Sequence, residues 1–131
     1  MSQHKRGKRE FQIALVGCGR ISKNHFDAIR KVDGLELTAV ADSSEERARA
    51  AGEEQGVPWY SSYPEMLRKA ECDVVTIATP SGMHSAQGIE AARAGKHVIT
   101  EKPMAITLEQ ADALVAATDA AGVRLFVVKQ N

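Results

Sequence analysis

Two glycines and one carboxylate in this sequence are spaced to bind a ligand that carries phosphates and ribose hydroxyls. Residues 17–22 (Gly-Cys-Gly-Arg-Ile-Ser) follow the apolar run at 11–16 and precede a helical pattern. In such a loop Gly17 allows a tight turn, and Gly19 lets the backbone approach a pyrophosphate. The helix offers N–H groups and the positive end of its dipole to the phosphates. A second apolar run ends at Asp42, whose carboxylate can accept hydrogen bonds from ribose hydroxyls.

This pattern predicts a dinucleotide site with NAD as its cofactor. The expected contacts from the two strand ends are Gly17, Gly19, Arg20, Ile21, Asp42 and Ser43. NADP is less favoured because Asp42 repels a 2′-phosphate and Ser43 and Ser44 supply no adjacent guanidinium, although Arg47 lies one helical turn further on. Ser22 stands where Gly or Ala is usual, but it is small enough for close packing. The alternative is a tight turn in an ordinary α/β domain, and the flanking strand, helix and carboxylate argue against it.

The rest of the chain alternates between apolar runs and helical patterns. Pro58 favours a position for the third strand at an edge of the sheet. The nearly continuous apolar run at 73–78 is typical of a parallel strand buried on both faces. We expect strands at 11–16, 35–41, 57–60, 73–78, 97–100 and 124–128, and helices at 24–32, 45–55, 63–69, 84–94 and 107–121. This order predicts the α/β class and a doubly wound parallel six-stranded sheet, the Rossmann fold, with strand order 3-2-1-4-5-6 over residues 11–131. Residues 1–10 are expected to form a disordered basic tail.

Polar segments also follow the fourth and fifth expected strands. Ligands of doubly wound sheets bind outside the carboxyl ends of the strands, so these segments should meet the glycine loop at one edge. A lysine beside a bound dinucleotide can polarise a hydroxyl or take its proton. The candidate cofactor contacts therefore extend to Thr79, Pro80, His84, Glu101, Lys102 and Pro103.

These motifs resemble the amino-terminal domain of the glucose–fructose oxidoreductase, inositol dehydrogenase and MocA family. The similarity rests on residues 17–22, Asp42, the segment 79–84, the Glu-Lys-Pro at 101–103 and the helix after it, and it covers residues 11–131 in order. It implies an NAD(P)-dependent oxidoreductase that transfers hydride between nicotinamide and a hydroxyl of a sugar, nucleotide sugar or cyclitol. The sequence around the glycine loop, the Glu-Lys-Pro and the chain end is also similar to the sequences of nucleotide-sugar 3-dehydrogenases of bacterial surface-polysaccharide synthesis.

The resemblance assigns roles to individual residues. Lys102 is the implied catalytic residue, Glu101 positions either Lys102 or the ribose, and the peptide before Pro103 is expected to be cis. His84 either faces the nicotinamide or caps and packs its helix, and both roles stay open. His25 is expected to be a packing histidine.

The resemblance also implies a second α/β domain that supplies most substrate contacts, an acid–base pair built around a histidine, and the oligomer interface. No segment of these 131 residues is left to form it, so we interpret the chain as a fragment of a longer, homo-oligomeric enzyme. The fragment itself is expected to be inactive, and to be a monomer or weak dimer with apolar surface uncovered near residues 125–128.

The two cysteines fit a reducing cytoplasm best, whereas the small-molecule partner, a sugar or nucleotide sugar, is implied by the resemblance. Lysine plus arginine equals aspartate plus glutamate, at 17 each, so no charge excess indicates nucleic acid or membrane as a partner. The two cysteines, Cys18 and Cys72, lack metal-ligand spacing, and no metal is expected. Cys18 is interpreted as a tolerated small side chain rather than a redox switch. The alternatives from other classes are a non-catalytic dinucleotide sensor or corepressor and a structural module with an empty loop.

Overall fold

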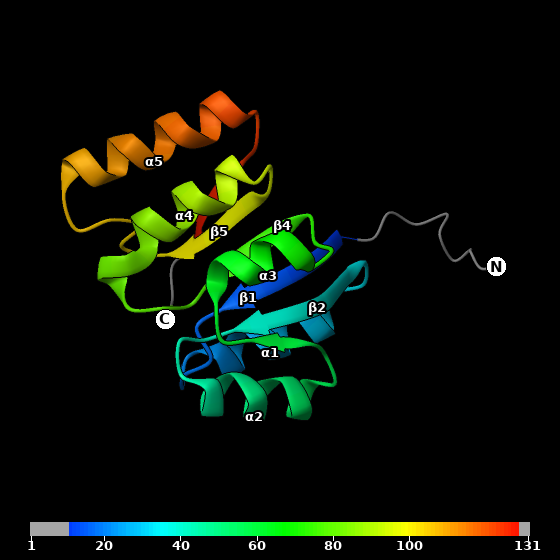
Figure 1. The fold of residues 1–131 in the computed structure, drawn as a ribbon. Helices are drawn as coiled ribbons and strands as arrows, with labels where there is room; N and C mark the ends of the chain where they lie inside the picture. Colours follow the sequence, from blue (N-terminus) through cyan, green and yellow to red (C-terminus); the bar gives the residue numbers. More distant parts are fainter. Residues whose placement is uncertain (1–10, 129–131) are drawn as a thin grey trace.

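Strands and helices alternate through residues 11–128, the part of the chain that the computed structural model describes (Figure 1). The expected basic tail at 1–10 and residues 129–131 lie outside this range. The strands are β1 (Phe11–Val16), β2 (Leu35–Ala41), β3 (Trp59–Tyr60), β4 (Val74–Ile77), β5 (His97–Glu101) and β6 (Leu125–Val128). The helices are α1 (Ser22–Lys31), α2 (Glu45–Gln55), α3 (Tyr63–Lys69), the 3₁₀ turn η1 (Ser81–Met83), α4 (His84–Arg93) and α5 (Leu108–Ala121).

The six strands form one parallel sheet in the order β3-β2-β1-β4-β5-β6, which confirms the predicted topology. Strand β1 lies at the centre and pairs with both β2 and β4. The chain order therefore reverses between β1 and β4. In a doubly wound sheet, a crevice opens at this switch point beside the carboxyl ends of the strands.

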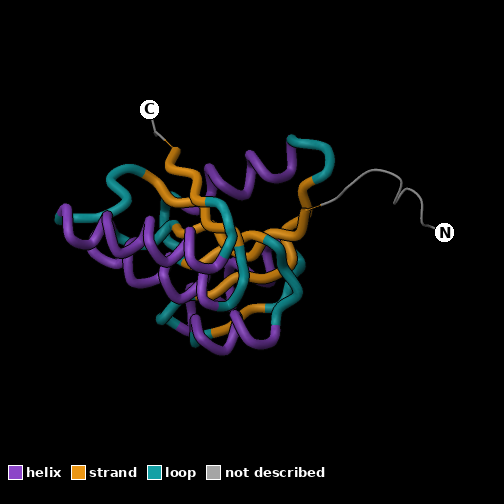
Figure 2. Tube along the Cα trace, turned by 90° about the horizontal axis from the view of Figure 1, so that it is seen from above, coloured by secondary structure: helices purple, strands orange, loops and turns teal. Residues whose placement is uncertain are grey.

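Helices cover the sheet on both faces (Figure 1 and Figure 2). Successive residues of a strand point to opposite faces, so β1 contributes to both layers. Ala14 and Val16 belong to the cluster that holds Met66 of α3, whereas Leu15 packs with Phe26 of α1. Because both faces of β1 are covered, the strand is apolar throughout its buried part.

Helix α5 packs mainly on α4. Leu114 is its fully buried side chain and lies over Gly88 of α4. A Cβ atom at Gly88 would come within 2.7 Å of Leu114 Cδ1. The glycine thus sets how closely the two helices approach.

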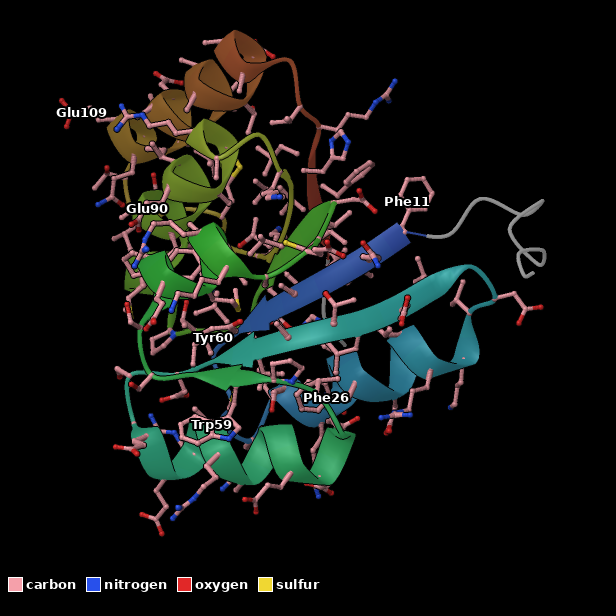
Figure 3. All side chains as sticks on the ribbon, turned by 45° about the vertical axis from the view of Figure 1, so that its right-hand side comes forward. Phe11, Phe26, Trp59, Tyr60, Glu90 and Glu109 are labelled. Atoms are coloured by element: carbon pink, nitrogen blue, oxygen red, sulfur yellow. The ribbon has the colours of Figure 1, made fainter. Side chains whose placement is uncertain are left out.

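Strand β3 is shorter than the sequence predicts, with two residues in place of four. Pro58 has no N–H to donate, although its carbonyl accepts a hydrogen bond from Val40 N at 3.1 Å. Helix α2 ends at its C-cap Gly56, which has a φ of 73°, and the N–H of Val57 donates to Gly52 O in the last turn. Val57 therefore belongs to the helix end rather than to the strand. Trp59 then lies against α2 (Figure 3). A Cβ atom added at Gly52 of α2 would lie 2.7 Å from Cβ of Trp59. Trp59 is therefore a packing residue.

Strand β6 leaves apolar side chains accessible at one edge of the sheet. Phe126, Val127 and Val128 are 48%, 41% and 38% exposed. This agrees with the apolar surface that we expected near residues 125–128. The weak self-association inferred from it stays a prediction.

Candidate functional site

A cavity of about 740 Å³ lies at the switch point, beside the carboxyl ends of β1, β2 and β4. Its volume falls in the range of pockets that hold small molecules and cofactors, which is roughly 300–1,000 Å³. Eight of the predicted contacts line it: Gly17, Gly19, Arg20, Ile21, Asp42, Ser43, Thr79 and Pro80. Four predicted residues do not, namely His84, Glu101, Lys102 and Pro103.

Gly17 makes the tight turn out of β1. Its φ of 101° lies in the left-handed region, and a Cβ there would be 2.6 Å from the backbone carbon of Ala78. A Cβ at Gly19, by contrast, would meet no atom within 4 Å. Gly17 is thus required by the fold, whereas Gly19 faces open space on the cavity side. These are the two roles that a phosphate-binding loop needs.

The loop tolerates a serine at its third motif position, because the hydroxyl of Ser22 is hydrogen-bonded within the loop. The side chain is 3% exposed, and its hydroxyl donates to Gly19 O at 2.6 Å. The hydroxyl therefore has a partner inside the loop and closes the turn that presents Gly19. The sequence predicted only that the side chain was small enough to pack.

The start of α1 offers donors to an anion. Helices α2, α3 and α5 each begin with a side-chain cap, from Ser44, Ser62 and Thr107, but α1 has none. Within residues 11–128, the N–H groups of Gly19, Arg20 and Ile21 donate to no protein atom. Free N–H groups at a helix N-terminus bind phosphate, so the loop fits the pyrophosphate of a dinucleotide.

Asp42 directly follows β2, and its carboxylate is already hydrogen-bonded. Its oxygens accept from the backbone N–H groups of Cys18 and Ser44, both at 2.8 Å, and from Arg47 Nη2 at 2.9 Å and Nε at 3.3 Å. Burial of the carboxyl works against its ionised form. The hydrogen bonds from Arg47, Ser44 and Cys18 outweigh burial and hold its pKa below the ordinary value. The site therefore presents an anion at the ribose end.

His84 joins two loops beneath the cavity. The side chain is 2% exposed, with Nε2 2.7 Å from Thr79 O and Nδ1 2.9 Å from Pro103 O. A neutral imidazole donates to one of these carbonyls, and an imidazolium donates to both. Both ring nitrogens thus have backbone partners, which favours the packing role, and the role facing the nicotinamide stays a prediction. His84 connects the loop after β4 to the loop after β5.

The Glu-Lys-Pro segment lies at the carboxyl end of β5, at the same edge of the sheet as the glycine loop. The Lys102–Pro103 peptide is cis, as the family resemblance implied. The N–H of Lys102 donates to Val128 O at 3.0 Å, and its side chain is exposed. Glu101 is 7% exposed, and its Oε2 lies 2.6 Å from Nε2 of His25 on α1. The sequence did not predict this contact, which connects the helix of the phosphate loop to the residue before Lys102.

The far wall of the cavity comes from α3, η1 and α4, and none of its residues was predicted as a contact. Tyr63 donates through its hydroxyl to Gln87 O at 2.6 Å, and burial raises the pKa of that phenol. Gln87 accepts from Thr79 Oγ1 and so orients a predicted contact. Met83, Gln87 and Glu90 are spaced by four and three residues, which places them on one face of a helix. That spacing was the signal available in the sequence.

No metal centre accompanies the cavity within residues 11–128, where no three His, Cys, Asp or Glu side chains are grouped to hold an ion. No helix of the same range is long and apolar enough to cross a bilayer.

The thiol of Cys18 is expected to be unreactive. Burial and then the charge of Asp42 raise its pKa to about 12, from an ordinary value of 9.0. Because the thiolate is the nucleophile, alkylation by iodoacetamide at pH 8 should be at least about tenfold slower at Cys18 than for free cysteine. Peptide mass spectrometry resolves Cys18 from Cys72. A rate equal to that of free cysteine would support the redox-switch alternative instead.

Comparison with known proteins agrees with this geometry. The profile of an oxidoreductase family with an NAD-binding Rossmann fold (GFO_IDH_MocA) matches residues 11–129. The WlbA dehydrogenase of Bordetella pertussis, solved with NADH and UDP-GlcNAcA, is 48% identical with a TM-score of 0.89, and the match covers 92% of this chain and 37% of that one. D-apiose dehydrogenase of Paraburkholderia graminis is 43% identical over 91% of this chain and 32% of its own length. Myo-inositol 2-dehydrogenase of Thermotoga maritima is 33% identical over 88% and 35%.

The chain thus spans about a third of the length of these relatives. The match includes every element of the sheet and the whole cavity lining. The chain belongs to the Gfo/Idh/MocA family of oxidoreductases, and residues 11–129 are its NAD-binding Rossmann domain.

Proposed function

We propose that this domain serves a two-domain, homo-oligomeric enzyme of the cytoplasm that oxidises a hydroxyl of a sugar, nucleotide sugar or cyclitol with NAD. The observation that carries the proposal is the placement of Lys102. Lys102 directly follows β5, on the side of the sheet formed by the carboxyl ends of the strands, where the phosphate loop and Asp42 also lie. A nucleotide sugar is the favoured substrate class, since the 48% identical WlbA was solved with UDP-GlcNAcA.

The residues of the cavity would hold NAD along its length. The free N–H groups at the start of α1 would bind the pyrophosphate, and Asp42 would accept from the ribose of the adenosine. Thr79 and Pro80, at the end of β4, would border the nicotinamide half. When bound, NAD supplies the hydride acceptor.

Lys102 would act on the proton of the substrate. Its Nζ would polarise the hydroxyl and take up the proton that leaves when the C–H hydride departs. Glu101 and His25 would fix the segment that carries Lys102, through their contact at 2.6 Å. The other substrate contacts would come from a second domain.

The 131-residue chain is expected to bind NAD(H) without turnover. All the strands that build the cavity are present, so calorimetric titration should detect binding, weaker than in the longer enzyme because one wall of the nicotinamide pocket is missing. No hydride transfer should be detectable at 340 nm with nucleotide sugars or inositols. Robust turnover by this chain alone would mean that the catalytic machinery is misplaced. Binding without turnover even in the longer protein would favour the sensor.

NAD(H) is expected to bind at least tenfold more tightly than NADP(H), or roughly 1.4 kcal/mol. The buried carboxylate of Asp42 repels a 2′-phosphate, whereas it accepts hydrogen bonds from a ribose diol. Asp42→Ala should weaken NAD(H) more than NADP(H), as measured by titration with each cofactor. Equal or tighter binding of NADP(H) by the unaltered chain would contradict this assignment.

A further inference from the structure

The position of Lys102 is set by its backbone and not by its side chain. Within residues 11–128, Nζ of Lys102 has no hydrogen-bond or ion-pair partner. Its backbone N–H donates to Val128 O of β6 at 3.0 Å. On the other side, the carbonyl oxygen of Pro103 lies 2.9 Å from Nδ1 of His84. Where the amine of Lys102 can reach therefore depends on what holds this loop after β5.

His84 contacts both loops that border the proposed reaction site. Its second ring nitrogen, Nε2, lies 2.7 Å from Thr79 O, and Thr79 lines the cavity at the end of β4. Carbonyl oxygens only accept hydrogen bonds, so the histidine ring supplies the proton in either contact. The ring is buried, which keeps water from replacing it at these carbonyls. A single side chain thus connects the cavity wall to the residue after Lys102.

Neighbouring residues of α4 hold the same two loops at further points. Gln87 accepts from Thr79 Oγ1 at 2.5 Å, which fixes the side chain of Thr79. Ser85 donates to Gln110 O at 2.8 Å, in the first turn of α5. The side chain of Gln110 in turn accepts from two backbone N–H groups at the end of the loop after β5. Helix α4 is therefore the support for both loops, and His84 is its contact nearest to Lys102 in the chain.

We propose that His84 is a positioning residue for the reaction: its ring fixes the loop after β5 to the loop after β4, and so holds Lys102 beside the nicotinamide half of the cavity. Without the ring, two buried carbonyl oxygens lose their donor, and the loops would move apart to find others. A misplacement of about 1 Å at a reacting group can cost about 10² in rate. The inference rests on the proposed role of Lys102 as proton acceptor.

His84→Phe removes both ring nitrogens and keeps a planar ring, and its first effect is measurable on the 131-residue chain. The backbone N–H of Lys102 should exchange with water at least about tenfold faster, as followed by NMR, while amides of β1 keep their rates. His84→Gln retains N–H donors and should restore part of this protection. NADH affinity should change less than about threefold in either variant, because the phosphate loop and Asp42 are untouched.

Turnover in the longer enzyme separates a positioning role from a merely structural one. His84→Phe should lower the turnover number at least about tenfold and change KM for NAD less than about threefold. If the ring acts through Lys102, its loss has no further effect once that amine is gone. In the Lys102→Ala background, His84→Phe should therefore lower turnover by less than about twofold.

His97 provides a matched control. It begins β5, at the opposite end of the strand from Lys102, and its Nδ1 accepts from the N–H of Arg124 at 3.0 Å. His97→Phe thus also removes a hydrogen bond between a histidine ring and the backbone. It should change neither the exchange rate of the Lys102 amide nor the turnover number.

The unaltered chain offers a test that needs no variant. A ring N–H of His84 that exchanges with water as fast as that of free imidazole would overturn the contact with the two loops. If His84→Phe does not fold, His84→Gln is measured against the same expectations, with smaller losses.

The two proposals fail in different ways. Unchanged turnover in a folded His84→Phe, or an equal further loss in the Lys102→Ala background, would show that His84 does not act through Lys102, which would itself remain catalytic. A larger loss of NADH affinity than of turnover would indicate a direct cofactor contact and would also overturn the positioning role. Near-normal turnover of Lys102→Ala would instead remove the proposed mechanism, and this inference would fall with it.

Discussion

Lys102→Ala in the longer enzyme proposed above is expected to lower the turnover number by about 10² or more. The side chain is exposed and lies at the carboxyl end of β5. In the proposed role, its loss would remove a proton acceptor from the reaction, and it removes no packing from the core. The hydrogen bond of this residue to Val128 O uses its backbone N–H and survives the substitution. Melting temperature should therefore change little while steady-state turnover collapses.

Two variants sharpen this experiment. Lys102→Arg keeps the charge but should not restore turnover fully, because guanidinium does not readily release its proton. Lys69→Ala removes an exposed lysine that pairs with Glu65 on α3, and turnover should be unaffected. Near-normal turnover of Lys102→Ala would remove Lys102 from the mechanism.

Gly17→Ala is expected to destabilise the domain by roughly 3 kcal/mol, enough to unfold much of a marginal chain. Alanine at a φ of 101° is strained, and its Cβ would lie 2.6 Å from Ala78 C and 2.7 Å from Thr79 N. These are backbone atoms of the neighbouring strand end, so no side chain can rotate to relieve the clash. Denaturant unfolding followed by circular dichroism measures the loss.

Gly19→Ala is the matched substitution in the same loop. A Cβ at this position meets no protein atom within 4 Å and needs no unusual φ, so stability should stay within about 0.5 kcal/mol. The methyl group would nonetheless occupy the space where a pyrophosphate approaches the backbone. NADH affinity should fall at least about tenfold. Unchanged affinity in Gly19→Ala would mean that the pyrophosphate lies elsewhere.

The core of the fold could be predicted because the central strands β1 and β4 are buried between helical layers, and helix ends such as those of α5 carry their own signals. Thr107 and Gln110 cap α5 as a reciprocal pair, and Gly122 ends it at a φ of 71°. Boundaries were less predictable. Helix α1 begins at Ser22 rather than at residue 24, because it starts directly from the phosphate loop and has no capping side chain to mark its first residue.

The site was only partly predictable, because its contacts cross between elements. The contact of Glu101 with His25 joins residues 76 positions apart, and no local pattern marks it. The pair of Arg47 with Asp42 depends on how α2 leaves β2, and the position of His84 depends on two loops that meet only in the folded chain. The sequence predicted eight of the residues that line the cavity. It did not show which protein groups already occupy them.

The position of the cavity at the switch point has a consequence for folding cooperativity. The sheet consists of two halves, β1-β2-β3 and β4-β5-β6, which are joined through the pairing of β1 with β4. Gly17 belongs to the first half and Thr79 to the second, so a ligand in this cavity binds only when both are docked. At a concentration of about 100 times Kd, it would add roughly 2.7 kcal/mol to the stability of the assembled sheet. Amide hydrogen exchange should then slow in both halves together. The bound cofactor would couple the local unfolding of the two halves of the sheet into one cooperative transition.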